Sequence, residues 1–238
     1  MKKAIVIGAS SGIGRELAKI LVQNEYQVGI TGRRENLLEE LCSEKPESYF
    51  VQSFDLQDTA SVATNLDALY ERMGELDLVI ISAGLSCSNT DFDYYAESET
   101  LSVNVLAFTL ICNWALRIFR EQKRGHLVGI TSVAGARGWR ISSAYSASKA
   151  FQINYLEGLR NYVAFLKIPV TITNIISGYV DTRMKGNDYV LWVAPPEVAA
   201  RQIFRSIQKK KKIAYTYRRW RFGYFLFRHL PNKLVEIS

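Results

Sequence analysis

The sequence predicts an α/β fold: a single-domain, doubly wound parallel sheet with helices on both of its faces. Short runs such as residues 3–7 and 76–81 are apolar except for Lys3 and Asp77, as expected of strands that are buried on both faces. Amphipathic helical stretches alternate with these runs, which is typical of parallel βαβ units. The 238 residues are 48% hydrophobic and contain no repeat or Pro/Gly-rich linker, so one core is expected.

The first strand and helix predict an anion-binding turn between them. Residues 3–7 form the expected strand, residues 15–23 have helical periodicity, and Gly8-x-x-x-Gly12-x-Gly14 lies between the two. Glycines let the backbone approach a pyrophosphate, and the helix N-terminus offers free N–H groups and a positive dipole end. The spacing differs from the usual G-x-G-x-x-G, and a simple turn with a helix cap is the alternative interpretation.

Two arginines after the second strand, residues 27–31, bear on the choice of nucleotide. Folds that prefer NAD usually carry an acid here, which holds the ribose 2′-hydroxyl. In this chain Arg33 and Arg34 follow Thr31-Gly32, and a planar guanidinium suits a 2′-phosphate. The pattern favours NADP(H), and the alternative is a solvated arginine pair at the start of a helix.

Small and polar residues follow the other predicted strands. Strands are expected over residues 49–54, 76–81, 126–131 and 170–176, and helices over residues 36–41, 61–73, 101–119, 145–167 and 198–207. The four strands are followed by Asp55-Leu56, Ser82-Ala83-Gly84, Ser132 and Ser177-Gly178. Since ligands of such sheets bind beyond the carboxyl ends of the strands, we expect these residues to line one site.

Tyr145 and Lys149 are candidate catalytic residues. Side chains four residues apart lie one above the other on a helix, which places an ammonium beside a phenol. A neighbouring cation favours the phenolate and lowers the phenol pKa from its ordinary value of roughly 10. Such a tyrosine can give a proton to a carbonyl oxygen or take one from an alcohol. Taken alone, the spacing is more typical of a solvated helix face.

In this order, the motifs resemble those of the short-chain dehydrogenase/reductase family, which has a Rossmann-type fold. The resemblance covers nearly all of residues 1–200. It rests on Gly8-x-x-x-Gly12-x-Gly14, Asp55, Ser82-Ala83-Gly84, Asn104, Ser132, Tyr145-x-x-x-Lys149 and Ser177-Gly178 with Thr182. The family often has Asn-Ala-Gly at residues 82–84 and Pro-Gly at residues 177–178, and neither departure touches a catalytic position.

The resemblance implies an oxidoreductase that transfers a hydride between NADP(H) and a carbonyl or alcohol substrate. Tyr145 would be the general acid or base, and Lys149 would lower its pKa and hold the nicotinamide ribose. Ser132 would bind the substrate oxygen, and Asn104 would hold a water that links Lys149 to solvent. The implied cofactor contacts are Gly8, Ser10, Gly12, Ile13 and Gly14 at the pyrophosphate, Arg33 with assistance from Arg34 or Ser11 at the 2′-phosphate, Asp55 and Leu56 at the adenine, Ala83 and Gly84 at the ribose, and Gly178, Val180 and Thr182 at the nicotinamide.

Substrate and assembly are less closely defined. A pocket for a small, apolar carbonyl or alcohol compound is expected, lined by Val133, Ala134, Trp139 and Tyr179, with residues 183–192 as a lid. The family resemblance implies a homodimer or homotetramer formed through the helices that contain Leu101 and Tyr145. The alternative function is a non-catalytic nucleotide-binding or interaction protein on the same fold, which would bind the cofactor without turnover.

Composition limits the other classes of function. The chain has only two histidines, His126 and His229, and its three cysteines lack metal-ligand spacing, so no metal site is expected. We find no secretory signal pattern and no apolar run of the length of a spanning helix, and we expect a reduced, cytoplasmic location.

Basic and aromatic residues are concentrated in a C-terminal extension, residues 201–238. This extension holds 11 Lys+Arg and one acidic residue, whereas residues 1–200 hold 19 and 22, a net charge of −3. Aromatic side chains interleaved with basic ones suit an anionic membrane surface. The alternatives are a tail that packs on the domain or on a partner subunit, and a nucleic-acid contact, which we do not expect because no recognised motif is present.

Overall fold

The computed structural model describes residues 1–180 and 193–231. Seven strands form one sheet in the order β3-β2-β1-β4-β5-β6-β7, and every neighbouring pair is parallel. The strands are β1 (Lys2–Ile7), β2 (Tyr26–Gly32), β3 (Tyr49–Ser53), β4 (Leu78–Ile81), β5 (Gly125–Ser132), β6 (Val170–Ser177) and β7 (Ile213–Tyr215). The strand order reverses between β1 and β4, and a crevice opens at such a switch point, beyond the carboxyl ends of the strands. The predicted doubly wound parallel sheet is confirmed.

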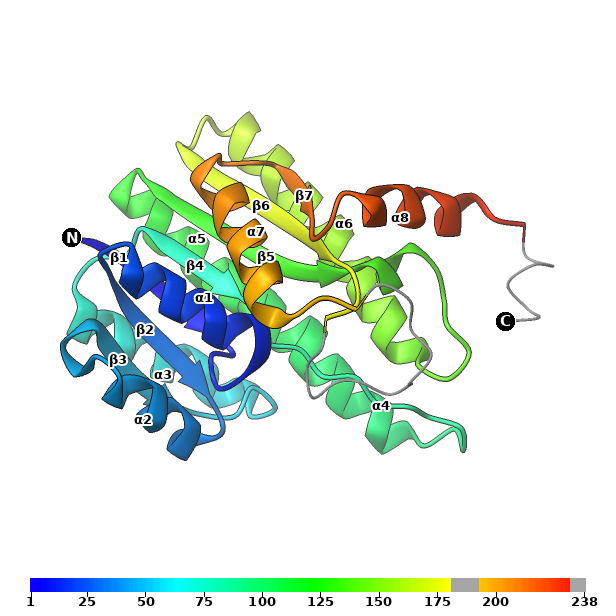
Figure 1. The fold of residues 1–238 in the computed structure, drawn as a ribbon, viewed down its shortest axis with the longest axis horizontal. Coiled ribbons are helices and arrows are strands. Elements are labelled where there is room, and N and C mark those ends of the chain that lie inside the picture. Colours follow the sequence, from blue (N-terminus) through cyan, green and yellow to red (C-terminus); the bar gives the residue numbers. More distant parts are fainter. Residues whose placement is uncertain (181–192, 232–238) are drawn as a thin grey trace.

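Helices cover both faces of the sheet (Figure 1). Apolar side chains from α1 (Gly12–Gln23), α2 (Glu35–Ser43) and α7 (Pro196–Gln208) share one buried cluster with the sheet. On the other face, α3 (Thr59–Met73), α5 (Phe108–Gln122) and α6 (Ser143–Phe165) form a second cluster. Strand β4 and residues 4–7 of β1 are apolar throughout because both of their faces are buried in this way.

The helix expected over residues 101–119 is longer and less regular than its sequence suggests. It begins with α4 (Tyr94–Leu101), continues as a π-helical segment, η2 (Ser102–Ala107), and then becomes α5. Among the described residues, this one stretch, Tyr94–Gln122, is long and apolar enough to cross a membrane, in contrast to our expectation from the sequence. Its apolar character has a simpler cause, because α5 buries Ile111, Trp114 and Phe119 in the core.

The basic extension continues the domain. Its first part completes α7, and β7 then adds the last strand of the sheet beside β6. The helix α8 (Arg219–His229), which the sequence analysis did not expect, packs against the short 3-10 segment η3 (Val133–Ala136) that follows β5. In Figure 1, α8 lies at the right, beside the carboxyl ends of β5 and β6. The extension therefore contributes to the edge of the sheet where ligands bind.

Candidate active site

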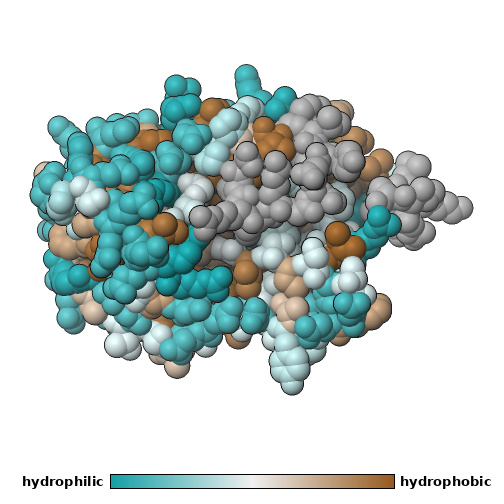
Figure 2. Space-filling view, turned by 60° about the horizontal axis from the view of Figure 1, so that its bottom comes forward, coloured by the Kyte–Doolittle hydropathy of each residue, from teal (hydrophilic) through white to brown (hydrophobic). Residues whose placement is uncertain are grey.

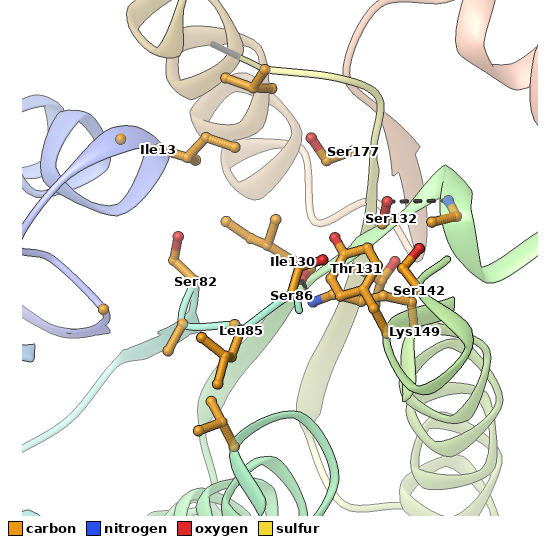
Figure 3. Close-up of a pocket in the computed structure, with 18 of the residues that line it drawn as sticks. Ile13, Ser82, Leu85, Ser86, Ile130, Thr131, Ser132, Ser142, Lys149 and Ser177 are labelled. Carbon is orange, nitrogen blue, oxygen red and sulfur yellow. Dashed lines mark hydrogen bonds between the residues drawn. The ribbon is translucent and has the colours of Figure 1, made fainter. Parts of the chain in front are cut away.

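A cleft of about 1310 Å³ runs along the carboxyl edge of the sheet. It is lined by the turn after β1 and by residues at or beyond the ends of β2, β3, β4, β5 and β6. In Figure 3, Ile13, Ser82 and Leu85 lie on one side of the cleft, and Ser132 and Lys149 lie on the other side. The fold thus brings together the segments that the sequence analysis placed at separate strand ends.

The glycine-rich turn is shaped for close approach of a ligand backbone. Gly8 has φ +88°, and a Cβ there would lie 2.7 Å from the backbone N of Ala83. A Cβ on Gly14 would lie 2.1 Å from the carbonyl oxygen of Gly8, so helix α1 starts directly against the end of β1. Ser11 precedes α1 and makes no capping hydrogen bond with its side chain. The first-turn N–H groups of α1 therefore suit an anion such as a pyrophosphate.

Arg34 is tied to this turn more closely than Arg33. Its Nη2 donates hydrogen bonds of 2.7 Å to the hydroxyls of both Ser10 and Ser11. The Arg33 side chain is 58% exposed, and its Nη1 lies 3.9 Å from Asp55. Both arginines line the cleft, with Asp55 and Leu56 beside them. The predicted 2′-phosphate and adenine residues thus share one end of the cleft, and Arg34 is the better fixed of the two cations.

The Ser82-Ala83-Gly84 turn lies between the two ends of the cleft. The N–H groups of Ser82 and Ala83 both donate to the carbonyl oxygen of Ile7, at 2.9 and 2.8 Å. A Cβ on Gly84 would lie 3.3 Å from the Nζ of Lys149. A glycine here leaves this part of the cleft floor open to a flat ring or a ribose.

Tyr145, Ser132 and Lys149 form a group at the other end of the cleft. The Lys149 Nζ lies 5.7 Å from the centre of the Tyr145 ring. The Ser132 hydroxyl accepts from the N–H of Ala134 at 3.1 Å (Figure 3) and is hydrogen-bonded to the Tyr145 phenol. Because Ala134 N–H donates to Ser132, the hydroxyl proton of Ser132 is available for Tyr145 or for a substrate oxygen.

Burial dominates the proton affinities of this group. It lowers the pKa of the Lys149 ammonium to about 8, so Lys149 is mostly charged at neutral pH. Burial also raises the pKa of Tyr145, whereas the hydrogen bond with Ser132 lowers it. From the sequence we expected Lys149 to lower the pKa of Tyr145. In the structure the pKa is raised instead, because the removal of the phenolate from water is the larger effect.

Asn104 is completely buried in the π-helical segment η2, and its side chain fixes the loop after Gly84. Its Oδ1 accepts from the N–H of Leu85 at 2.9 Å, and its Nδ2 donates to the Leu85 carbonyl at 2.7 Å and to the Ser148 hydroxyl at 3.0 Å. π-Helical turns often occur at functional sites. Asn104 therefore links η2 to both the cleft floor and helix α6.

Gln152 connects Asn104 to Lys149. Its Nε2 donates to the Asn104 carbonyl at 2.8 Å, and its Oε1 accepts from the Lys149 Nζ at 2.9 Å. From the sequence we expected Asn104 to hold a water that links Lys149 to solvent, and that role stays a prediction. In the structure the Gln152 side chain joins the Asn104 carbonyl to the Lys149 ammonium and orients the ammonium.

The last predicted contacts lie at the end of β6. Gly178 donates its N–H to the Thr216 hydroxyl at 2.9 Å, and Val180 pairs with Ala194 in an isolated β-bridge. The substrate-side predictions Val133, Ala134, Trp139 and Tyr179 also line the cleft. Thr182 and the proposed lid, residues 183–192, lie outside the described residues.

Comparison with known proteins identifies the family and agrees with the fold. A family model described as short chain dehydrogenase matches residues 2–189. This chain belongs to the short-chain dehydrogenase family. It is 32% identical over 192 residues to an uncharacterized oxidoreductase of Staphylococcus saprophyticus, covering 78% of this chain and 81% of the relative. The family assignment predicted from the sequence is confirmed, and with it a general oxidoreductase activity.

Solved short-chain dehydrogenases have the same fold at lower sequence identity. A Burkholderia phymatum enzyme in complex with NAD superposes with a TM-score of 0.84 at 18% identity, covering 94% of this chain and 92% of that one. An actinorhodin polyketide ketoreductase with NADPH gives a TM-score of 0.80 at 20% identity, covering 90% and 94%. One neighbour holds NAD and the other NADPH, so family membership indicates a nicotinamide dinucleotide without choosing between them.

Two parts of this short-chain dehydrogenase site were missed from the sequence. Gln152 lies three residues after Lys149 on α6, so helical spacing could have placed it on the same face. Trp220 packs on Gly178, where a Cβ would lie 2.1 Å from the indole ring, and no local pattern signals this contact. Among the described residues, no cluster of His, Cys, Asp or Glu could hold a metal ion.

Proposed function

We propose that this chain is an NADP(H)-dependent oxidoreductase of carbonyl or alcohol substrates, with Tyr145 as the general acid or base. The observation that carries the proposal is the placement of the Tyr145 phenol between Ser132 and Lys149 in a cleft that also holds the glycine-rich turn. The nicotinamide cofactor, when bound, supplies or accepts the hydride. The chain supplies orientation and protons.

Each proposed catalytic residue has a distinct task in carbonyl reduction. Tyr145 donates its phenolic proton to the substrate oxygen, and Ser132 donates a hydrogen bond to the same oxygen as negative charge develops there. The Lys149 ammonium stabilises the phenolate that remains and can reach ribose hydroxyls above Gly84. Asn104 holds the cleft floor in place through Leu85. In alcohol oxidation the same groups act in reverse.

The preference for NADP(H) rests on the arginine end of the cleft. The chain has Arg33 and Arg34 where an NAD-preferring fold usually has an acid, and Arg34 is already oriented by Ser10 and Ser11. A guanidinium pair recognises a phosphate through charge-assisted hydrogen bonds. We assign the 2′-phosphate to these two side chains.

The proposal is tested by following NADPH and NADH oxidation with a panel of ketones, aldehydes and quinones, in parallel with NADPH binding. We expect turnover with NADPH that is lost in Tyr145→Phe, with binding retained. Tight NADPH binding without turnover of any carbonyl class would favour the non-catalytic alternative. If neither nucleotide binds, the assignment of the glycine-rich turn is wrong.

Assembly and location are further parts of the proposal. The large apolar side chains Leu106 and Phe151 are exposed on η2 and α6, and the Phe151 ring stacks on Tyr155 at 5.4 Å. These faces favour a homodimer or homotetramer in which they pack on a second copy. The free cysteines Cys42, Cys87 and Cys112 are consistent with a reduced cytoplasmic compartment.

A further inference from the structure

Helix α8 has two different apolar faces. Trp220, Gly223 and Tyr224 are buried, and they form a small core cluster with Val133 and Ile176 at the ends of β5 and β6. These residues account for only part of the aromatic content of the helix. The inward face fixes α8 on the domain and leaves its outward face to be explained.

The outward face is apolar in its centre and basic on both flanks. Phe222, Phe225 and Leu226 are 70%, 61% and 45% exposed. At 3.6 residues per turn they lie on one side of the helix, with Arg219 on one flank and with Arg221 and Arg228 on the other. Long arginine side chains beside an exposed aromatic stripe can reach lipid headgroups while the rings enter the interface.

The charge around α8 has one sign. The chain contains no acidic residue between Glu197 and Glu236. The basic residues of the extension form two groups, because Lys209–Lys212 precede β7 and the arginines of α8 follow it. The two groups therefore lie at opposite ends of β7, and only the group on α8 accompanies exposed aromatic side chains.

Helix α8 also packs against residues that line the substrate end of the cleft. The Trp139 ring, which lines the cleft, contacts Phe227 with ring centres 5.6 Å apart. Arg137 donates to the carbonyl oxygens of Phe227 and Leu230. Trp220 packs on Gly178 and lies 5.5 Å from the Tyr179 ring. A surface that binds the outer face of α8 would thus lie next to the substrate entrance.

We propose that α8 is an interfacial helix that docks this protein on an anionic lipid bilayer, with Phe222, Phe225 and Leu226 in the interface and the flanking arginines on the headgroups. Docking places the substrate end of the cleft at the membrane, and it assigns the substrate to membrane-borne carbonyl or alcohol compounds. The docking is independent of hydride transfer, whereas the substrate assignment rests on the proposed function.

The test is co-sedimentation of the full-length protein with phosphatidylcholine vesicles that contain or lack phosphatidylglycerol. We expect binding that requires the anionic lipid, decreases with salt and falls about tenfold or more in Phe222→Ser/Phe225→Ser. Arg221→Gln/Arg228→Gln should weaken binding in the same way. The matched control replaces all four of Lys209–Lys212 by Gln; although it removes twice as many charges, it should weaken binding less. Retained NADPH binding shows that each variant is folded.

Several outcomes would overturn the docking. Equal binding to both kinds of vesicle, or unchanged binding of the double Phe variant, removes the role of the outer face. Loss of a dimer in the same variant, measured by sedimentation velocity without lipid, identifies a second copy of the chain as the occupant. Salt-sensitive binding to a DNA duplex without binding to anionic vesicles identifies nucleic acid. The protein could also bind the vesicles and yet turn over a short water-soluble ketone as fast as a long-chain analogue in vesicles. That result would overturn the substrate assignment and leave the docking in place.

Discussion

Lys149 and Arg33 line the same cleft, but they are held in different ways. Lys149 is 4% exposed and hydrogen-bonded to Gln152, which is bonded in turn to a carbonyl of the π-helical segment η2. The Arg33 side chain is 58% exposed and has an ion-pair contact at 3.9 Å. The residues proposed for proton transfer are fixed by the core, whereas Arg33, one of the two residues proposed to select the nucleotide, is largely solvated. Chemistry and cofactor preference should therefore respond differently to mutation, to pH and to loss of packing.

The largest effect is expected at the buried end of the cleft. Tyr145→Phe removes the proton donor, and kcat should fall by about 10²–10⁴-fold while NADPH binding is retained. Tyr155→Phe is the matched control, because Tyr155 lies on the same helix as Tyr145 but outside the cleft. Its hydroxyl accepts a hydrogen bond from the Asn113 side chain at 2.8 Å. Steady-state kinetics of both variants check the prediction. Similar losses in the two variants would indicate damage to α6 rather than loss of an acid.

A buried polar group away from the cleft shows what burial does by itself. Burial lowers the pKa of His126 to about 4, and its Nε2 lies 2.8 Å from the Thr173 hydroxyl. Since the unfolded chain binds a proton at about pH 6.5, stability from this group is complete above that pH and is lost as pH falls toward 4. The loss should approach about 3 kcal/mol, from a shift of roughly 2.5 pKa units.

The histidine prediction is checked by urea unfolding of wild type and His126→Asn between pH 4 and 7. The difference in unfolding free energy between the two proteins should shrink as the pH falls, because the variant has no group to protonate there. A difference that is constant with pH would mean that His126 is not held neutral by burial.

Gln152 tests whether the support of Lys149 matters as much as its burial. Gln152→Leu removes an acceptor for the ammonium, so the pKa of Lys149 should fall below about 8 and the alkaline limb of activity should move to lower pH. Gln152→Glu should move that limb to higher pH. The loss in folding stability for Gln152→Leu should be about 1–3 kcal/mol, because the Asn104 carbonyl loses its donor.

Gln122 provides the control for this amide. It bridges the backbone of Leu76 through both side-chain atoms, at 2.8 and 3.2 Å, outside the cleft. Gln122→Leu should lower stability and leave the pH profile of activity unchanged. An identical pH profile for wild type and Gln152→Leu would show that Gln152 has only a structural role.

The smallest effect is expected at the arginine end of the cleft. Arg34→Ala should raise the KM for NADPH by about 10–100-fold, the equivalent of one or two charge-assisted hydrogen bonds, and change the KM for NADH little. Arg33→Ala should act in the same direction. Arg124→Ala, which breaks exposed ion pairs with Glu75 and Asp77 outside the cleft, serves as the control. Equal changes for NADPH and NADH would contradict a 2′-phosphate contact.

The sequence predicted the fold and most of the residues that line the cleft, because both depend on local patterns. Uninterrupted apolar runs identified the buried strands, and small residues after Ile7 and Ile81 marked the turns that approach a ligand. The role of Gln152 was not predicted, since it depends on the π-helical shift that brings the Asn104 carbonyl toward α6. The sequence also gave no signal for the two-faced packing of α8, because its aromatic residues occur on both sides of the helix.

The distribution of charge has a consequence for how the protein approaches a surface. Residues 201–231 contain ten Lys+Arg and no acid, while residues 1–200 carry a net charge of −3. The molecule is therefore an electric dipole with its positive pole on the β7 side. A negatively charged surface orients such a dipole before contact, with its positive pole toward the surface. Added salt shortens the Debye length below about 10 Å, so the rate of encounter with the surface should fall.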